Sequence, residues 1–91
     1  MKTSDMMKVI HQFEQDMIDY KKQALINISK NVYKLRTHKG YSQNDLAMLI
    51  GISRPTITHI EQAKHDCMLT TYLKIAKALD CDIIDLLKQE D

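Results

Sequence analysis

The twenty residues from Gln43 to Gln62, QNDLAMLIGISRPTITHIEQ, determine how this chain folds. Gly51 divides the stretch into two short segments, and glycine readily adopts the positive φ that a tight turn between helices requires. Ala47 is small enough to let two helices cross closely. Four apolar residues are expected to form the buried side of the pair, namely Leu46, Ile52, Ile57 and Ile60. The stretch therefore predicts two short helices joined by a tight turn.

The second helix of this pair is predicted from Ser53 to Gln62. Ser53 is a good N-cap, and Pro55 falls in the first turn, where a missing N–H costs nothing. Polar and exposed positions lie opposite the buried side: Arg54, Pro55, Thr58, His59 and Gln62. A helix pair of this kind can place the N-terminus of its second helix in the major groove of a duplex.

The remainder of the chain also predicts helices. An amphipathic helix is expected from about Ser4 to Ile26, with Thr3, Ser4 or Asp5 as its N-cap. The apolar pattern changes phase near Asn27, which predicts a bend or break there before a second helix from 28 to 38. Gly40 suits the left-handed residue that follows a helix. Ser42 should cap the next helix, Thr70 or Thr71 should begin a later one, and residues 83–87 should form the last.

Composition limits the class of protein. Ninety-one residues with two glycines, one proline and no tryptophan suit a single all-α domain with a short extension. We divide the chain into an N-terminal extension, residues 1–26, and a domain, residues 27–91. No stretch resembles a signal peptide or approaches the length of a membrane span, so we expect a cytoplasmic protein that binds no membrane. Cys67 and Cys81 are then expected to be reduced.

The charge is distributed unevenly although the net charge is only +1. Residues 28–65 carry six basic and two acidic side chains, whereas residues 66–91 carry three basic and six acidic ones. A basic centre is the pattern that a phosphate backbone attracts. The distribution therefore favours nucleic acid as a partner.

These motifs together resemble the Cro/repressor-type helix-turn-helix family, a five-helix domain of phage repressors and bacterial regulators. The resemblance covers about two thirds of the chain. It lies in three stretches: LRTHKGYSQNDLA at 35–47, GISRPTITHIEQAK at 51–64 and YLKIAKALDCDIIDLL at 72–87. It implies an all-α, phage-repressor-like fold with an additional N-terminal amphipathic helix. It also implies a homodimer that binds double-stranded DNA and regulates transcription, most simply as a repressor.

The resemblance also implies roles for individual residues. The base-reading positions are Arg54, Pro55, Thr58 and His59, and positions that contact the DNA backbone or orient the helix are Gln43, Asn44, Ser53, Thr56, Gln62 and Lys64. Arg36 and Glu61 match a partly buried ion pair. Ala63 departs from the family, which often has glycine there, and Pro55 offers no donor, so its contact must be apolar.

The N-terminal extension carries an apolar stripe at heptad-like steps: Met6, Ile10, Phe13, Met17 and Tyr20. The stripe can fold back on its own domain or pair with the same helix of a second subunit, and we expect pairing. Family members usually dimerise through the C-terminal part of the domain, which here holds Ile83, Ile84 and Leu87. The extension has equal numbers of acidic and basic residues, so it is not expected to bind DNA.

Two other classes of function remain as hypotheses. The chain could be an interaction module, such as the antitoxin of a toxin–antitoxin pair, with residues 1–26 binding a partner protein. It could also be an enzyme or a metal sensor. His65, Cys67 and Cys81 lack the paired spacing of metal ligands, and no phosphate-binding loop or nucleophile motif is present. We therefore expect no catalysis, metal or cofactor.

Overall fold

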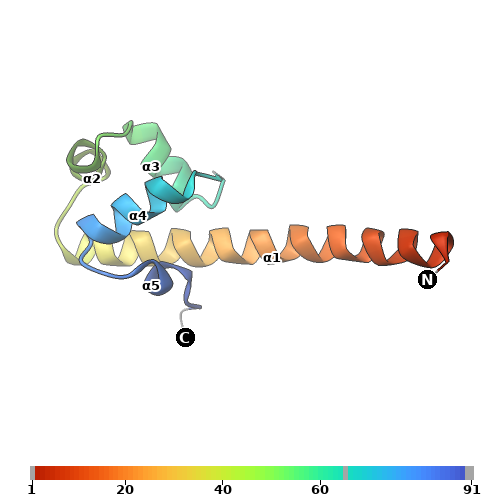
Figure 1. The fold of residues 1–91 in the computed structure, drawn as a ribbon. Coiled ribbons are helices and arrows are strands. Elements are labelled where there is room, and N and C mark those ends of the chain that lie inside the picture. The colour runs from red at the N-terminus through yellow and green to blue at the C-terminus, as the bar shows by residue number, and fades with distance from the viewer. Residues whose placement is uncertain (1, 65, 90–91) are drawn as a thin grey trace.

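The computed structural model describes residues 2–64 and 66–89, and within them it contains five α-helices and no strand. They are α1 (Thr3–His38), α2 (Gln43–Ile50), α3 (Arg54–Glu61), α4 (Leu69–Ala78) and α5 (Ile83–Leu87). In Figure 1, α3 lies on one side of α1 and α5 lies on the other, while α2 and α4 close the domain at the C-terminal end of α1. The prediction of an all-α, repressor-like fold is confirmed.

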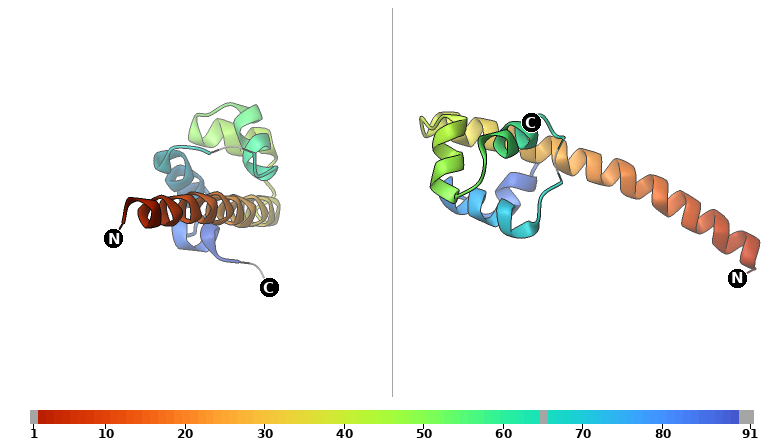
Figure 2. Two further views of the ribbon diagram at one scale, coloured as in Figure 1. Left: turned by 90° about the vertical axis from the view of Figure 1, so that its right-hand side faces the viewer. Right: turned by 90° about the horizontal axis from the view of Figure 1, so that it is seen from above.

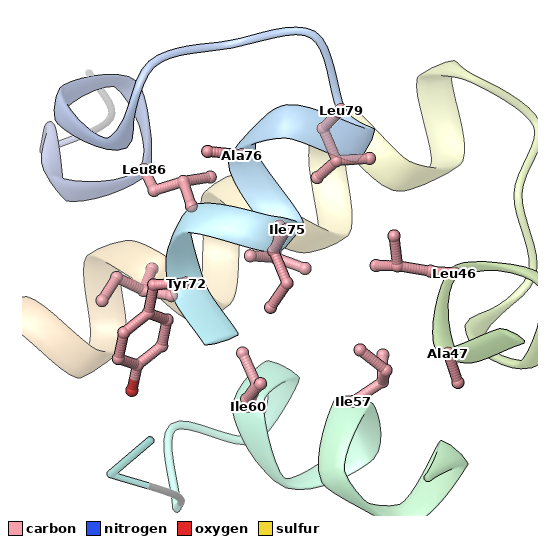
Figure 3. Close-up of a cluster of buried hydrophobic side chains, with 11 residues drawn as sticks. Leu46, Ala47, Ile57, Ile60, Tyr72, Ile75, Ala76, Leu79 and Leu86 are labelled. Atoms are coloured by element: carbon pink, nitrogen blue, oxygen red, sulfur yellow. The ribbon is translucent and has the colours of Figure 1, made fainter. Parts of the chain in front are cut away.

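The core brings apolar residues from all five helices together. Figure 3 shows Ile57 and Ile60 of α3 pointing toward Ile75 of α4, with Leu46 beside them. Its buried apolar members are Ile28, Val32, Leu46, Ala47, Ile57, Ile60, Tyr72, Ile75, Ala76, Leu79 and Leu86. The predicted inner face of the helix pair is thus buried, apart from Ile52, which is half-buried at the edge of this core. The burial of these side chains from water is the main force that holds α3 in place.

The predicted break near Asn27 is wrong, because α1 runs without interruption through 36 residues. The phase change has another cause. Asn27 donates to the carbonyl of Leu87 at 3.0 Å, and Asn31 donates to the carbonyls of Leu86 and Lys88 at 2.9 and 2.8 Å. Carbonyls at the end of a helix have no partner within it. The two asparagines supply these partners for α5, so polar residues lie on the apolar face without ending the helix.

Three helix ends form as their sequences predict. Ser42 and Asp45 make a reciprocal capping box at the start of α2, which also lowers the pKa of the Asp45 carboxyl, chiefly because the Ser42 N–H donates to it. Gly51, with φ of 74°, ends α2 in the left-handed conformation. Ser53 caps α3, and Pro55 lies in its first turn. These local signals set the short loops on both sides of α3.

Two helix starts differ from the prediction. α1 begins after Lys2, so Thr3, Ser4 and Asp5 lie inside its first turn rather than at the cap. α4 begins at Leu69 after Met68, and neither threonine caps it. The Cys67 N–H donates to the Tyr72 hydroxyl at 3.1 Å, and this contact holds the chain just before α4 in an extended course.

The first two thirds of α1 project beyond the domain (Figure 2). We call residues 3–23 the N-terminal arm, and all of them are exposed. At its base, Lys21 forms a surface ion pair with Asp66 at 2.8 Å. The molecule is consequently elongated, with principal extents of 56 × 28 × 19 Å.

Candidate nucleic-acid interface

Several side chains near the N-terminal end of α3 are exposed to solvent. Ser53 accepts a hydrogen bond from the Thr56 N–H at 3.3 Å, and the two hydroxyls lie 2.7 Å apart. This cap fixes where α3 begins. Arg54 and Pro55 in the first turn are exposed, and so is His59 in the second turn. The buried residues Ile57 and Ile60 face the core, so the exposed ones must point outward on the opposite side.

Gln43 connects the start of α2 to the exposed side of α3. Its side-chain oxygen accepts from the Thr58 hydroxyl at 2.8 Å, and its side-chain nitrogen donates to Glu61 at 3.3 Å. Both hydrogen bonds join α2 to α3, and both restrict the rotation of the side chains that form them. The sequence suggested that Gln43 and Thr58 belong to one surface. It contained no signal for their direct hydrogen bond, since a 15-residue separation has no helical periodicity to reveal it.

Arg36 and Glu61 form a bidentate ion pair between α1 and α3. Arg36 Nε and one terminal nitrogen lie 2.7 and 2.8 Å from the two carboxylate oxygens. The side chains are only 9% and 7% exposed. The other terminal nitrogen donates to the Tyr41 carbonyl at 2.8 Å, and the guanidinium lies 5.4 Å from the centre of the Tyr33 ring. The hydrogen bonds to Glu61 raise the pKa of Arg36 further, so the pair stays charged.

The suggested base-reading residues gather around one shallow hollow, which is lined by Gln43, Arg54, Pro55, Thr58 and His59. Four of these five lie on α3 and one lies at the start of α2. The other suggested backbone-contacting or orienting residues lie around this hollow or toward the end of α3. Asn44 is exposed and contacts the Met48 sulfur at 3.5 Å, whereas Gln62 and Lys64 are exposed at the C-terminal end of α3. Arg54 is the basic group of this hollow, and Gln43 and Thr58, which bond to each other, are polar groups in it.

The turn after α3 keeps the conformation that glycine would favour. Ala63 has a φ of 58°, in the left-handed region. The Lys64 N–H then donates to the His59 carbonyl at 2.9 Å and closes the end of the helix. The departure at this position therefore changes the residue and leaves the turn intact, with the Cβ of Ala63 adding strain.

Comparison with known proteins assigns this chain to a family. The model of a family described as helix-turn-helix (HTH_3) matches residues 32–86, more than half of the chain. The chain belongs to this family of DNA-binding transcription regulators.

Relatives of this helix-turn-helix protein include regulators and an antitoxin. The uncharacterized HTH-type transcriptional regulator MJ0272 of Methanocaldococcus jannaschii is 44% identical over 50 residues, which cover 55% of this chain and 76% of the relative. Antitoxin HipB of Escherichia coli is 35% identical over 66 residues, which cover 71% of this chain and 70% of the relative.

Solved structures of restriction-modification controller proteins share the fold. C.AhdI from Aeromonas hydrophila has a TM-score of 0.65 at 35% identity, and the match covers 68% of this chain and 94% of that protein. The C.Esp1396I tetramer in complex with its natural 35 base-pair operator has a TM-score of 0.61 at 27% identity, and covers 71% and 96%.

The residues suggested for dimerisation lie mostly on the surface of this helix-turn-helix chain. On the arm, Phe13 and Tyr20 are 63% and 75% exposed, and Met6, Ile10 and Met17 are exposed as well. On α5, Ile84 and Leu87 are 63% and 44% exposed. Ile83 instead packs against the core of its own subunit. The arm therefore does not fold back on its own domain.

Among the described residues, no three metal-ligating side chains cluster, and no helix could cross a membrane. Cys67 and Cys81 are half-buried, and burial raises the pKa of each thiol. His65, the third residue of the alternative metal-site hypothesis, lies outside the described residues.

Proposed function

We propose that this chain is a sequence-specific regulator, most simply a repressor, that binds double-stranded DNA as a homodimer. Each subunit inserts α3 into the major groove of one half of a pseudo-palindromic operator. One observation carries the proposal: Arg54, Pro55 and His59 are exposed together on a helix that is anchored to the domain through Gln43 and through the buried Arg36–Glu61 pair. Such rigid presentation reduces the entropy that a reading surface loses on binding.

The chemistry of the exposed side chains suits the edges of base pairs. Arginine donates two hydrogen bonds to guanine in the major groove, and the apolar ring of proline can contact the methyl group of thymine. Gln43 and Ser53 offer donors to phosphates beside the groove, and Lys64 offers a positive charge. Among the similar structures, C.Esp1396I is a protein whose tetramer was solved on its operator, which supports DNA as the ligand of this shared fold.

Selection from random duplexes tests the proposal. The purified chain is incubated with random double-stranded DNA at about 0.15 M salt, and bound molecules are amplified and sequenced. We expect a pseudo-palindrome whose half-sites are centred about 34 Å apart, one helical turn of DNA. Arg54→Ala serves as the matched variant and should relax one base position in each half-site. Enrichment of no sequence over the starting pool would contradict the proposal.

A second candidate function is supported by the exposed arm and by the similarity to antitoxin HipB. In this alternative, the arm binds a different protein, while α3 still binds DNA. Sedimentation of the purified chain distinguishes the two. A dimer held together by the arm supports self-pairing, whereas a monomer with a free arm at micromolar concentration supports a separate partner protein.

A further inference from the structure

The direction in which the arm's apolar stripe faces can be derived from α1 itself. Each residue of an α-helix advances by about 100°, so residues three, four or seven apart share a face. Asn27 follows Tyr20 by seven positions, and Asn31 follows Asn27 by four. Because both asparagines bond to carbonyls at the end of α5, the stripe and α5 lie on the same side of α1. The exposed Ile84 and Leu87 of α5 therefore lie toward the same side as the stripe.

The recognition helix α3 lies on a different side of α1. Arg36 binds Glu61 of α3, and Val32, one turn earlier, is buried in the core that α3 also lines. At about 100° per residue, their mean direction is about a quarter turn from the middle of the stripe. Figure 1 agrees, since α3 and α5 lie on different sides of α1. If two copies pair through the stripe, the direction from each α1 to its α3 is therefore roughly perpendicular to the line between the two arms.

We propose that two copies of this chain pair their arms antiparallel through the stripe, and that this orientation places both α3 helices on one face of the dimer. The inference rests on the proposed binding of one duplex by two subunits. In an antiparallel pair, the two-fold axis is perpendicular to the plane of the two arms, so both α3 helices project from the same side. In a parallel pair, the axis runs along the arms, and the two α3 helices face opposite directions.

Charge selects the register of the antiparallel pair. Glu14 and Lys21 flank the stripe on the same edge, one heptad apart, and same-edge positions face each other in antiparallel pairs. With Phe13 opposite the small Ala24 of the partner subunit, Glu14 lies beside Lys21 of the partner subunit, which also bonds to Asp66 in its own chain. If the arms slide by one heptad toward greater overlap, Glu14 lies opposite Glu14 of the partner subunit, and Asp16 lies opposite Asp16 of the partner subunit. Both pairs of like charges repel. The attractive register therefore centres the pair between residues 18 and 19.

This register gives the end of each arm a surface to cover. Ile10 comes level with Asn27 of the partner subunit, and Met6 comes level with Asn31 of the partner subunit, where that subunit's own α5 covers α1. In each chain those asparagines hold the C-terminal end of α5, beside the exposed Leu87. The tip of one arm thus reaches the apolar edge of α5 in the other copy, so one interface covers both exposed apolar regions.

The spacing of the two reading helices follows from the same register. The α1 residues that pack on α3 lie near position 32, so their counterparts in the two subunits are separated by about 40 Å at 1.5 Å per residue. One helical turn of DNA is about 34 Å. The antiparallel arms therefore hold the two α3 helices at nearly the spacing that adjacent major grooves on one side of a duplex require.

Two cysteine pairs test the orientation in the full chain. Both pairs are introduced after Cys67→Ser and Cys81→Ser have removed the native thiols. Glu14→Cys with Lys21→Cys places thiols together across an antiparallel pair, whereas Asp16→Cys with Lys21→Cys does so across a parallel pair. All three positions are exposed, and residues five or seven apart on one helix are too distant to form a disulfide within a chain. Non-reducing electrophoresis after mild oxidation reads out the covalent dimer.

We expect the 14/21 pair to give mostly covalent dimer and the 16/21 pair to give at least about tenfold less. The oxidised 14/21 dimer should bind the selected duplex within about threefold of the reduced protein. Cross-linking of the 16/21 pair instead, or of neither pair in a protein that sediments as a dimer, would overturn the antiparallel arrangement. A monomer in sedimentation would overturn arm pairing altogether. Recognition by α3 is judged separately, from Arg54-dependent binding to a single half-site.

Discussion

At the scale of single residues, Arg54 and Lys64 have different proposed roles: Arg54 reads a base and Lys64 attracts phosphate. Arg54 lies in the hollow at the N-terminal end of α3, whereas Lys64 is exposed beyond its C-terminal end. Arg54→Ala should cost about 1–3 kcal/mol on the selected site and relax one base position. Lys64→Ala should weaken all duplexes alike and lower the salt slope by about one. Binding titrations at several salt concentrations measure both, with Lys74→Ala on α4 as a control.

Ala63 offers a test of stability at one residue. A φ of 58° strains the backbone of a residue that has a Cβ, whereas glycine adopts this φ without that strain. We expect Ala63→Gly to stabilise the fold by about 0.5–1 kcal/mol, since part of the gain is offset by the larger entropy of glycine in the unfolded chain. Thermal denaturation should show a melting temperature higher by a few degrees. Ala78→Gly within α4 is the matched control and should destabilise. A lower melting temperature for Ala63→Gly would show that the turn carries no strain.

At the scale of secondary-structure elements, Arg36 and Glu61 connect α1 to α3. Either Arg36→Met or Glu61→Leu alone leaves the opposite charge buried without its partner, which costs about 3–5 kcal/mol. The double variant should lose less than the sum of the single losses. Chemical denaturation of the four proteins in the cycle gives the coupling energy. Additive and near-zero losses would mean that the pair contributes nothing to the position of α3.

The joint between α1 and α5 depends on Asn31. Its amide donates to two carbonyls that end α5, and its side chain is buried. Asn31→Leu would leave those carbonyls unsatisfied and should cost about 1–3 kcal/mol. Hydrogen exchange should show faster exchange in α5 with little change in α2 and α3. Lys30→Leu, at the exposed neighbouring position, is the control. Unchanged protection of α5 would show that water replaces the amide without loss.

At the scale of the whole molecule, the proposed pairing of the arms predicts which variants change the oligomeric state. Phe13→Asp with Met17→Asp places charges in the centre of the stripe, where pairing would have to bury them. We expect the dimer to dissociate in sedimentation at micromolar concentration. Affinity for the full palindrome should fall at least tenfold, whereas binding to a single half-site should change little, because each half is then bound separately.

The matched control for that prediction is Gln12→Asp with Gln15→Asp, which adds the same charge on the opposite side of the arm, away from the stripe. A stripe variant that stays a dimer with unchanged operator affinity would assign dimerisation to α5 alone. Circular dichroism checks that α1 stays helical in both variants. Because the arm makes few contacts with its own domain, thermal stability of the domain should change little in either protein.

Sequence reasoning correctly predicted the elements whose causes are local. The capping residues Ser42 and Ser53 and the glycine at 51 set the boundaries of α2 and α3, since each acts through bonds within a few residues. The alternation of apolar and polar residues predicted which side of α3 is buried, and resemblance predicted that Arg36 and Glu61 lie together. The exposed reading face was inferred from the same periodicity.

Features that depend on contacts between distant segments became visible in the folded structure alone. The polar residues Asn27 and Asn31 led to the prediction that the helix ends there. Their side-chain amides instead donate to α5 carbonyls more than fifty residues away, so α1 continues. The same contacts fix the side of α1 on which α5 lies, and the proposed antiparallel pairing depends on that side. Local sequence cannot reveal such partners, because a side-chain amide has the same chemistry whether water or a distant helix end accepts its hydrogen bond.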